Sequence, residues 1–157
     1  MQRINRTALS PLPPDRVFAR LADALSWPRW SPIGAAEVER AGPGEGEIRR
    51  FTTGRVVSRE EVVVFEPPHR FAYRLLSGLP LRGYVAEVAI APAADGSRIE
   101  WTSTFHGRWP GSGPLYRLIL GRFIGRVVEG LARPPVDAAD GSRGVDGGRA
   151  SRTPLEG

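Results

Sequence analysis

Arg49 and Glu60 are the two ionisable residues whose placement in this sequence could do chemistry. Arg49 alternates with Phe51 along one predicted strand, and Glu60 alternates with Val62 along the next, so each shares a strand face with apolar side chains. If those faces point inward, a guanidinium and a carboxyl group occupy a dry interior, which is costly unless they are paired or used. Arg49 could then hold a ligand carboxylate or enolate, and Glu60 could act as an acid or a base. Alternatively both point outward or pair with each other, and a shift of one residue in strand register decides the matter.

Aromatic residues with polar tips lie in the middle of other predicted strands. Tyr73, Tyr84 and Trp101 suit a pocket, because the ring packs while the polar tip orients a ligand. Tyr84 is the preferred pocket hydroxyl, whereas Trp101 fits plain core packing equally well. Trp30 fits either a pocket wall or a core anchor, and Trp27 is expected to be a core anchor.

Together these residues form the candidate site predicted from the sequence. The candidate catalytic residues are Glu60, Tyr84 and Arg49. The candidate ligand-binding residues are Trp30, Arg49, Phe51, Ser58, Glu60, Tyr73, Tyr84, Trp101, Phe105 and Phe123. No metal ligand is predicted, because His69 and His106 lack an Asp, Glu or Cys cluster at ligand spacing. No cofactor is expected either, because no Gly-rich phosphate loop follows a predicted strand.

The elements that must position these residues are mostly strands. Residues 2–9 predict a first strand, and the prolines before Asp15 predict a helix over residues 15–25. Alternating apolar residues then predict six more strands, with Ser58, Glu60, Val62 and Val64 on one face of the fourth. These six strands cover residues 36–41, 47–53, 55–65, 70–76, 82–91 and 98–106. The short connections between them favour antiparallel neighbours.

A long helix is predicted at the end of the folded region, over residues 114–132. One apolar stripe runs along it, formed by Tyr116, Leu120, Phe123, Val127 and Leu131. At 1.5 Å per residue this helix is about 28 Å long, enough to cross the whole sheet. The expected architecture is therefore an α+β fold in which a curved antiparallel sheet of about seven strands wraps around one helix. Such a sheet leaves space at one end of the helix, and an enclosed space suggests a ligand.

Composition limits the remaining possibilities. The chain has 157 residues and no cysteine, and its formal charge of +5 comes from 22 basic residues, all of them arginine. The arginines are scattered and most have acidic neighbours, so nucleic acid binding is not expected. The N-terminal residues lead into no apolar signal segment and no stretch is long enough to span a membrane, so a cytoplasmic location is expected. The predicted domain covers residues 1–133, followed by a disordered tail rich in Gly, Asp and Arg over residues 134–157.

Several short segments, taken in order, resemble one family. These segments are Pro13–Phe18, Trp27–Pro32, Gly44–Arg49, Arg59–Val62, Glu66–Tyr73 and Asp95–Trp101. Their order and spacing over about residues 3–132 resemble the START-like superfamily, and more narrowly its polyketide cyclase/dehydrase-like branch, the SRPBCC proteins. This resemblance implies a helix-grip fold with a deep, mostly apolar cavity between the sheet and the long helix. It also implies binding of lipids, polyketides, hormones or other hydrophobic molecules, which some members cyclise or dehydrate.

Two functions remain open on these grounds. In the first, the protein is a binding module for a small hydrophobic molecule such as a lipid, a polyketide or an aromatic metabolite, and acts as a monomer or homodimer. In the second, it is a cyclase or dehydratase that acts on such a ligand by acid/base chemistry, with Glu60 and either Tyr84 or Arg49 as the reacting groups. Binding without conversion is favoured, because no pair of residues forces a reaction class.

Overall fold

Seven antiparallel strands form a single sheet in the computed structural model, which describes residues 1–40 and 42–135. The strand order is β1-β7-β6-β5-β4-β3-β2. The strands are β1 (Gln2–Ser10), β2 (Ala35–Arg40), β3 (Ile48–Thr53), β4 (Val56–Glu66), β5 (Arg70–Ser77), β6 (Leu81–Ala93) and β7 (Gly96–Gly107). The helices are α1 (Pro14–Ala22), the short 3₁₀ turn η1 (Ala24–Ser26), α2 (Trp27–Trp30) and α3 (Gly113–Ala132). The predicted α+β architecture is confirmed.

The first helix ends at Ala22, three residues before its predicted end, and the chain then turns through η1 into α2. The predicted disordered tail lies, from residue 136 onward, outside the described residues, so the boundary near residue 133 stays a prediction. Pro134 and Pro135 follow α3 and are exposed.

The inner face of the sheet follows the alternation seen in the sequence. In β6 the side chains of Tyr84, Ala86, Val88 and Ile90 are buried, while their neighbours point away from the core. In β7 the buried series is Ser97, Ile99, Trp101, Ser103 and Phe105. This burial on one side of a strand only is what a sheet with one covered face requires.

An irregularity in β4 changes which residues face inward. The pairing with β5 shifts between Val62 and Val64, so Val63 is an additional residue at that point. Beyond it Phe65, and not Val64, turns toward the core and packs edge-on against Phe18, with ring centroids 5.2 Å apart. The prediction that Val64 shares a face with Ser58 and Glu60 is therefore wrong, because an additional residue inverts the alternation.

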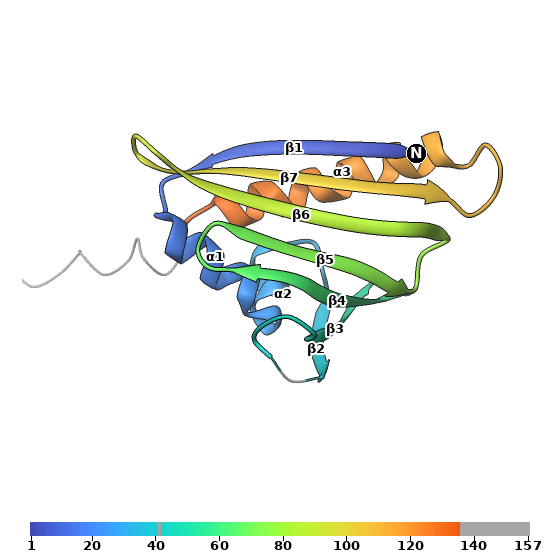
Figure 1. The fold of residues 1–157 in the computed structure, drawn as a ribbon, viewed down its shortest axis with the longest axis horizontal. Helices are drawn as coiled ribbons and strands as arrows, with labels where there is room; N and C mark the ends of the chain where they lie inside the picture. Colours follow the sequence, from blue (N-terminus) through green and yellow to red (C-terminus); the bar gives the residue numbers. More distant parts are fainter. Residues whose placement is uncertain (41, 136–157) are drawn as a thin grey trace, which may run out of the picture.

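Helix α3 packs along one side of the sheet and leaves the other side open. It lies behind β1 and β7, while α1 contacts β6 and β7, and α2 contacts β2 at the opposite edge of the sheet (Figure 1). Its C-terminal end is held by Ser10, whose Oγ donates a hydrogen bond to the Ala132 carbonyl at 2.7 Å. Its middle is held by Arg6, whose Nε donates to the Gly121 carbonyl at 3.2 Å.

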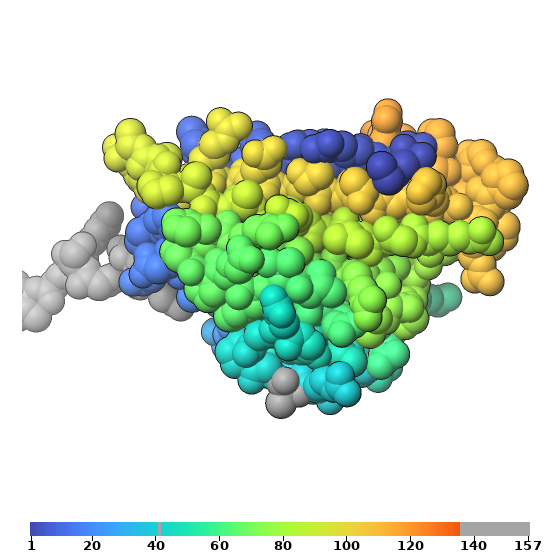
Figure 2. All heavy atoms as spheres, in the orientation of Figure 1, coloured from blue at the N-terminus to red at the C-terminus, as the bar shows by residue number. Residues whose placement is uncertain are grey.

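The outer face of the sheet carries no opening. Figure 2 shows it as a continuous surface across the neighbouring strands. Among residues 1–40 and 42–135, no helix combines the length and the apolar character needed to cross a lipid bilayer.

Candidate ligand-binding site

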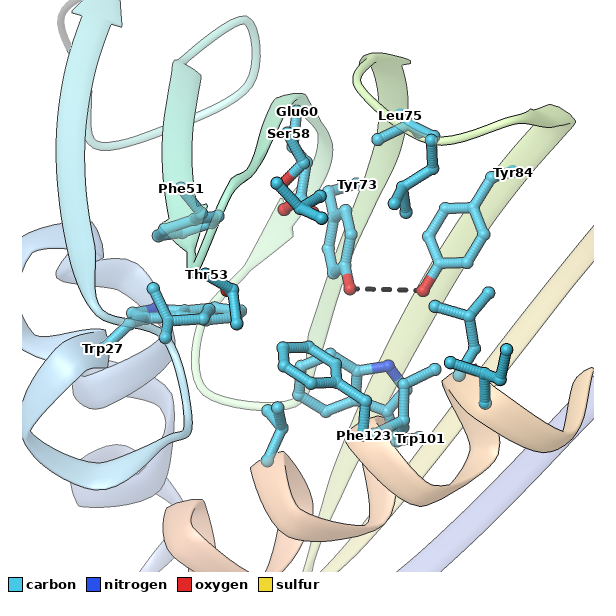
Figure 3. Close-up of a pocket in the computed structure, with 17 residues that line it drawn as sticks. Trp27, Phe51, Thr53, Ser58, Glu60, Tyr73, Leu75, Tyr84, Trp101 and Phe123 are labelled. Atoms are coloured by element: carbon cyan, nitrogen blue, oxygen red, sulfur yellow. Dashed lines mark hydrogen bonds between the residues drawn. The ribbon is translucent and has the colours of Figure 1, made fainter. Parts of the chain in front are cut away.

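A cavity of about 210 Å³ lies between the inner face of the sheet and α3. Figure 3 shows its walls, with side chains from β3 to β7 on one side and from α3 on the other. Most of the lining is aliphatic or aromatic. The lining residues are Trp27, Ile33, Phe51, Thr53, Val56, Ser58, Glu60, Tyr73, Leu75, Leu79, Tyr84, Trp101, Ile119, Leu120, Phe123, Ile124 and Val127.

The cavity opens to the surface at one end. Of the residues that line it, Val56 is 46% exposed and Ile119 is 53% exposed. They belong to the start of β4 and the N-terminal half of α3, and half-buried Leu79 in the β5–β6 loop is also part of the lining. We refer to Val56, Leu79 and Ile119 as the mouth, because they join the interior space to the solvent.

Trp27 forms the wall at the closed end of the cavity. It is buried, and its indole stacks on Phe51 with ring centroids 4.9 Å apart. Its Nε1 donates a hydrogen bond to the Leu21 carbonyl at the end of α1, at 3.2 Å. Trp27 is thus the core anchor that the sequence predicts, but it also lines the cavity, which the sequence analysis missed. A Trp in a four-residue helix gives no periodicity from which its direction could be read.

Two tyrosine hydroxyls meet inside the cavity. The Tyr73 and Tyr84 oxygens are 3.5 Å apart, and the Tyr84 hydroxyl is 3.1 Å from Ser103 Oγ (Figure 3 shows the tyrosine pair). The Tyr84 side chain follows a bulge in β6, where Gly83 adopts a positive φ of 61° and the pairing with β7 shifts. Burial raises the pKa of Tyr84 to about 12 and that of Tyr73 well above its usual range, so both phenols keep their protons.

Glu60 places a carboxyl group in the same cavity. The surrounding protein raises its pKa to about 8, and the nearby positive charge of Arg49 only partly opposes this shift. The cause is desolvation, which disfavours the charged form. At pH 7 the carboxyl is therefore mostly protonated. Within the described part of the chain, no group forms a hydrogen bond with it, so its proton is available to whatever enters the cavity.

Arg49 points inward, as one of the two predicted arrangements requires, but it does not line the cavity. Its side chain is 1% exposed and forms an ion pair with Glu47. It donates hydrogen bonds to the carbonyls of Leu21 and Ala22, at 2.7 and 2.8 Å. Burial lowers the pKa of Arg49, while the Glu47 carboxylate opposes that shift. Arg49 therefore caps the C-terminal end of α1, where helix carbonyls lack partners, and the predicted contact with a ligand is not available to it.

Two further predicted residues lie away from the cavity. Trp30 is half-buried against Trp27, and its Nε1 donates to Ser26 Oγ at 3.0 Å while the Arg20 guanidinium lies 5.4 Å above its ring. Phe105 is buried behind Tyr84, with ring centroids 6.1 Å apart. The other seven predicted ligand-binding residues do line the cavity, and their role toward a ligand stays a prediction. These seven are Phe51, Ser58, Glu60, Tyr73, Tyr84, Trp101 and Phe123.

Of the ten lining residues that sequence reasoning missed, four come from α3, more than from any other element. Ile119, Leu120, Ile124 and Val127 reach the cavity beside Phe123. The apolar stripe identified the covered face of this helix, but it could not separate residues that touch the sheet from residues that face a void. That distinction depends on where the sheet curves away.

The sequence matches the family described as "Polyketide cyclase / dehydrase and lipid transport" over residues 1–137. The chain belongs to this family. An uncharacterized protein of Mycobacterium tuberculosis is 28% identical over 123 residues, which cover 71% of this chain and 73% of that protein. The predicted family is therefore confirmed.

Solved structures show the same fold. XoxI from Bacillus cereus gives a TM-score of 0.72 at 17% identity, covering 84% of this chain and 94% of that one. A START superfamily protein from Mycobacterium smegmatis gives a TM-score of 0.69 at 14% identity, covering 83% of this chain and 94% of that one. The Zhui aromatase/cyclase from Streptomyces sp. R1128 gives a TM-score of 0.68 at 19% identity, covering 83% of this chain and 91% of that one. At these identities the likeness establishes the START-like fold and no more.

In this polyketide cyclase/dehydrase-like protein the cavity combines an apolar wall with a few polar groups. At neutral pH those that titrate, Glu60, Tyr73 and Tyr84, are predominantly uncharged. Such a lining favours a ligand that is apolar over most of its surface and carries few polar atoms.

Proposed function

We propose that the chain binds a small, largely apolar molecule in the cavity between the sheet and α3, and holds it without converting it. The observation that carries this proposal is the cavity itself, about 210 Å³ with a predominantly apolar lining. Protein interiors are close-packed, and voids larger than a water molecule are few. A hollow of this size next to the buried core supports a role in binding.

The size of the cavity limits the ligand. Pockets for drug-sized molecules measure roughly 300–1,000 Å³, so this cavity favours a smaller guest of about one or two rings. The mouth gives that guest a path, because Val56 and Ile119 are exposed while the residues deeper in the cavity are buried.

The family description supports the same ligand class. It names polyketide cyclases, dehydrases and lipid transport, and the substrates of these activities are largely hydrophobic. Ligands of this kind bind because apolar surface is removed from water, which contributes about 25 cal/mol of favourable free energy for each Å² buried.

Conversion of the ligand is the second candidate function, and Glu60 favours it. A carboxyl group with a pKa of about 8 in an apolar cavity is suited to donate a proton to a bound carbonyl. Tyr84 would be the partner hydroxyl, whereas Arg49 is occupied by Glu47 and the end of α1. Enolisation or dehydration would be the reaction class.

Native mass spectrometry of the protein purified from its host tests the binding proposal. A co-purified apolar molecule of one or two rings is the expected result. Its release by Ser58→Leu, which fills the cavity, would place it in this site. A protein that is consistently free of bound molecules, and whose Trp27 and Trp101 fluorescence responds to no apolar ring compound, would overturn the proposal.

A substitution at Glu60 separates binding from catalysis. If the ligand is converted, Glu60→Gln should lower turnover about a hundredfold or more while affinity changes little, because proton transfer by a positioned side chain contributes roughly 10²–10⁴-fold. If the protein only binds, the variant and the original protein recover the same unaltered molecule. Equal turnover in both proteins would remove Glu60 from any mechanism.

A further inference from the structure

Trp101 carries a hydrogen-bond donor that the protein leaves unused. Its side chain is 1% exposed, and its Nε1 has no acceptor among the described residues. The indole N–H of Trp27 donates to Leu21, and that of Trp30 donates to Ser26. A buried donor without a partner carries a free-energy cost, so such groups in folded proteins point to an acceptor supplied from elsewhere.

Two more donors line the same cavity, Tyr73 beside Trp101 and Tyr84 beside Tyr73. The ring centroids of Tyr73 and Trp101 are 6.1 Å apart in an edge-on arrangement, and those of Tyr73 and Tyr84 are also 6.1 Å apart. The three side chains come from the neighbouring strands β5, β6 and β7. Figure 3 shows both hydroxyls and the indole nitrogen directed toward the same part of the cavity. The 3.5 Å separation of the hydroxyls is too long for a strong hydrogen bond, so the Tyr73 hydroxyl is also poorly satisfied.

This part of the cavity offers protons and no charge. Both tyrosines and Glu60 are protonated at neutral pH, an indole N–H can only donate, and the Arg49 guanidinium is held by Glu47, Leu21 and Ala22. An anion would be poorly stabilised here, because a charge in an apolar interior needs a paired opposite charge. An uncharged acceptor oxygen is the group that the arrangement fits.

We infer that Trp101, Tyr73 and Tyr84 form a subsite, the donor subsite, which binds the carbonyl oxygen of an uncharged, apolar ring compound. This inference rests on the proposed function and adds the chemical class of the ligand and its orientation. The rings of the ligand lie toward Phe51 and Val127, and its oxygen lies toward the donor subsite.

Binding at the donor subsite requires a small movement. The Trp101 nitrogen has almost no accessible surface in this structure, so a neighbouring side chain must shift before an oxygen can reach it. Phe123 is half-buried and lines the same cavity from α3, which makes it the side chain that yields.

Calorimetry with two bicyclic compounds tests the inference on the 157-residue chain. Tetralin and 1-tetralone have nearly the same shape, but only 1-tetralone carries a carbonyl oxygen. A purely apolar cavity would favour tetralin, because the carbonyl would lose its hydrogen bonds to water. The donor subsite predicts the opposite order, with 1-tetralone bound about tenfold more tightly.

Trp101→Phe and Trp30→Phe form a pair for this experiment. Both replace an indole with a smaller ring, but Trp30 does not line the cavity and its N–H already donates to Ser26. We expect Trp101→Phe to abolish the preference for 1-tetralone and Trp30→Phe to retain it. If tetralin binds as tightly as 1-tetralone, or if Trp101→Phe leaves the preference intact, the inference is wrong while the proposed function stands. If neither compound binds, the inference is wrong, and the proposed function fails as well if the protein purified from its host carries no bound molecule and responds to no other apolar ring compound.

An NMR measurement on the unsubstituted protein removes any dependence on whether the variants fold. The chain has four tryptophans, hence four indole N–H signals, and Trp109 is exposed and serves as an internal reference. On addition of 1-tetralone the Trp101 signal should move downfield as its proton gains an acceptor, and tetralin should not cause this shift. A Trp101 signal that responds equally to both compounds would contradict the inference.

Discussion

The buried guanidinium of Arg49 illustrates how a residue of functional type can be occupied by the fold. It contacts Glu47 and the last carbonyls of α1, and it lies over the Phe71 ring at 5.0 Å. A charge buried this deeply is tolerated because each of its neighbours compensates for part of the lost hydration. Arg49 therefore joins β3 to α1, and with it fixes the closed end of the cavity.

Removing Arg49 should destabilise the protein strongly. Arg49→Met leaves the Glu47 carboxylate buried without its partner, which costs about 3–5 kcal/mol of unfolding free energy. Urea unfolding measures this loss. Glu47→Gln combined with Arg49→Met should recover a large part of it, because no unpaired charge remains. Arg59→Met is the control, since the Arg59–Glu39 pair lies at the surface and contributes little to stability. Equal effects of Arg49→Met and Arg59→Met would contradict this role.

Glu60 should make the stability of the protein depend on pH. Its pKa of about 8 in the folded state exceeds the ordinary value of 4.5, so the folded state binds the additional proton between these two pH values. Stability is fully present below about pH 4.5 and is lost as the pH rises through about 8. Between pH 5 and pH 9 this one group should lower the unfolding free energy by about 4 kcal/mol.

Chemical unfolding of Glu60→Gln at both pH values isolates that contribution. The variant should lose about 4 kcal/mol less than the unsubstituted protein over this range. Glu61→Gln is the matched control, because Glu61 lies on the opposite face of β4 and pairs with Arg74 at 2.6 Å. It should keep the original pH dependence. Parallel curves for Glu60→Gln and the unsubstituted protein would show that the carboxyl ionises without cost.

The site was predictable from the sequence where strand alternation decides direction. That alternation grouped Phe51 with Arg49, and Glu60 with Val62, on shared strand faces, but it left open whether those faces point inward, as the structure has them. It could not distinguish a residue that lines the void from one beneath the wall, so Phe105 was included. It also could not reveal that Glu47, one residue before β3 begins, takes Arg49 as its partner.

At the level of elements, α3 is held against α2 by close backbone contact at Gly130. A Cβ built on Gly130 would lie 1.6 Å from the Trp30 carbonyl oxygen, whereas one on Gly125 would lie 3.6 Å from the nearest atom, Arg6 Nε. The first is a clash with backbone and the second is an ordinary contact. Two glycines of one helix therefore differ in what they permit.

Alanine substitutions at these two glycines should have opposite effects on stability. Gly125→Ala should stabilise the protein by roughly 0.5–1 kcal/mol, because glycine is a poor helix former. Gly130→Ala gains the same helix propensity but forces α2 and α3 apart, and a net loss of about 1–3 kcal/mol is expected. Thermal unfolding of both variants measures the difference. If Gly130→Ala is as stable as Gly125→Ala, the contact between α2 and α3 is not rigid.

The order of elements was predictable because the sequence changes its period plainly. Alternation over residues 36–106 predicted every strand to within about two residues of its observed ends. The end of the first helix was not predicted correctly, because Leu25 continues the apolar spacing while Asp23 has already left the helical conformation, with a ψ of 92°. Likewise the shift at Val63 depends on the pairing with β5, which no local pattern encodes.

On the scale of the whole molecule, the cavity lowers the stability of the fold. Voids lower stability by about 24 cal/mol for each Å³, so 210 Å³ corresponds to an upper limit of about 5 kcal/mol. Small domains have a total stability of only about 5–15 kcal/mol. A core built for stability alone would fill this space with the larger side chains that strands accept, and Ser58 and Thr53 leave it open.

Filling the cavity should therefore exchange binding for stability. Ser58→Leu places an apolar side chain into the space and should raise the unfolding free energy by about 0.5–2 kcal/mol. The same variant should bind 1-tetralone at least tenfold more weakly, because the ligand and the leucine compete for one volume. Ser58→Ala removes the hydroxyl without filling the space, so the affinity of this variant for 1-tetralone should stay within about threefold of the original.

Thermal unfolding with and without 1-tetralone measures both stability and binding, since a ligand at a hundred times its Kd adds about 2.7 kcal/mol to the stability of the folded state. A Ser58→Leu protein that still gains this full increment would mean that the ligand lies outside the space between the sheet and α3.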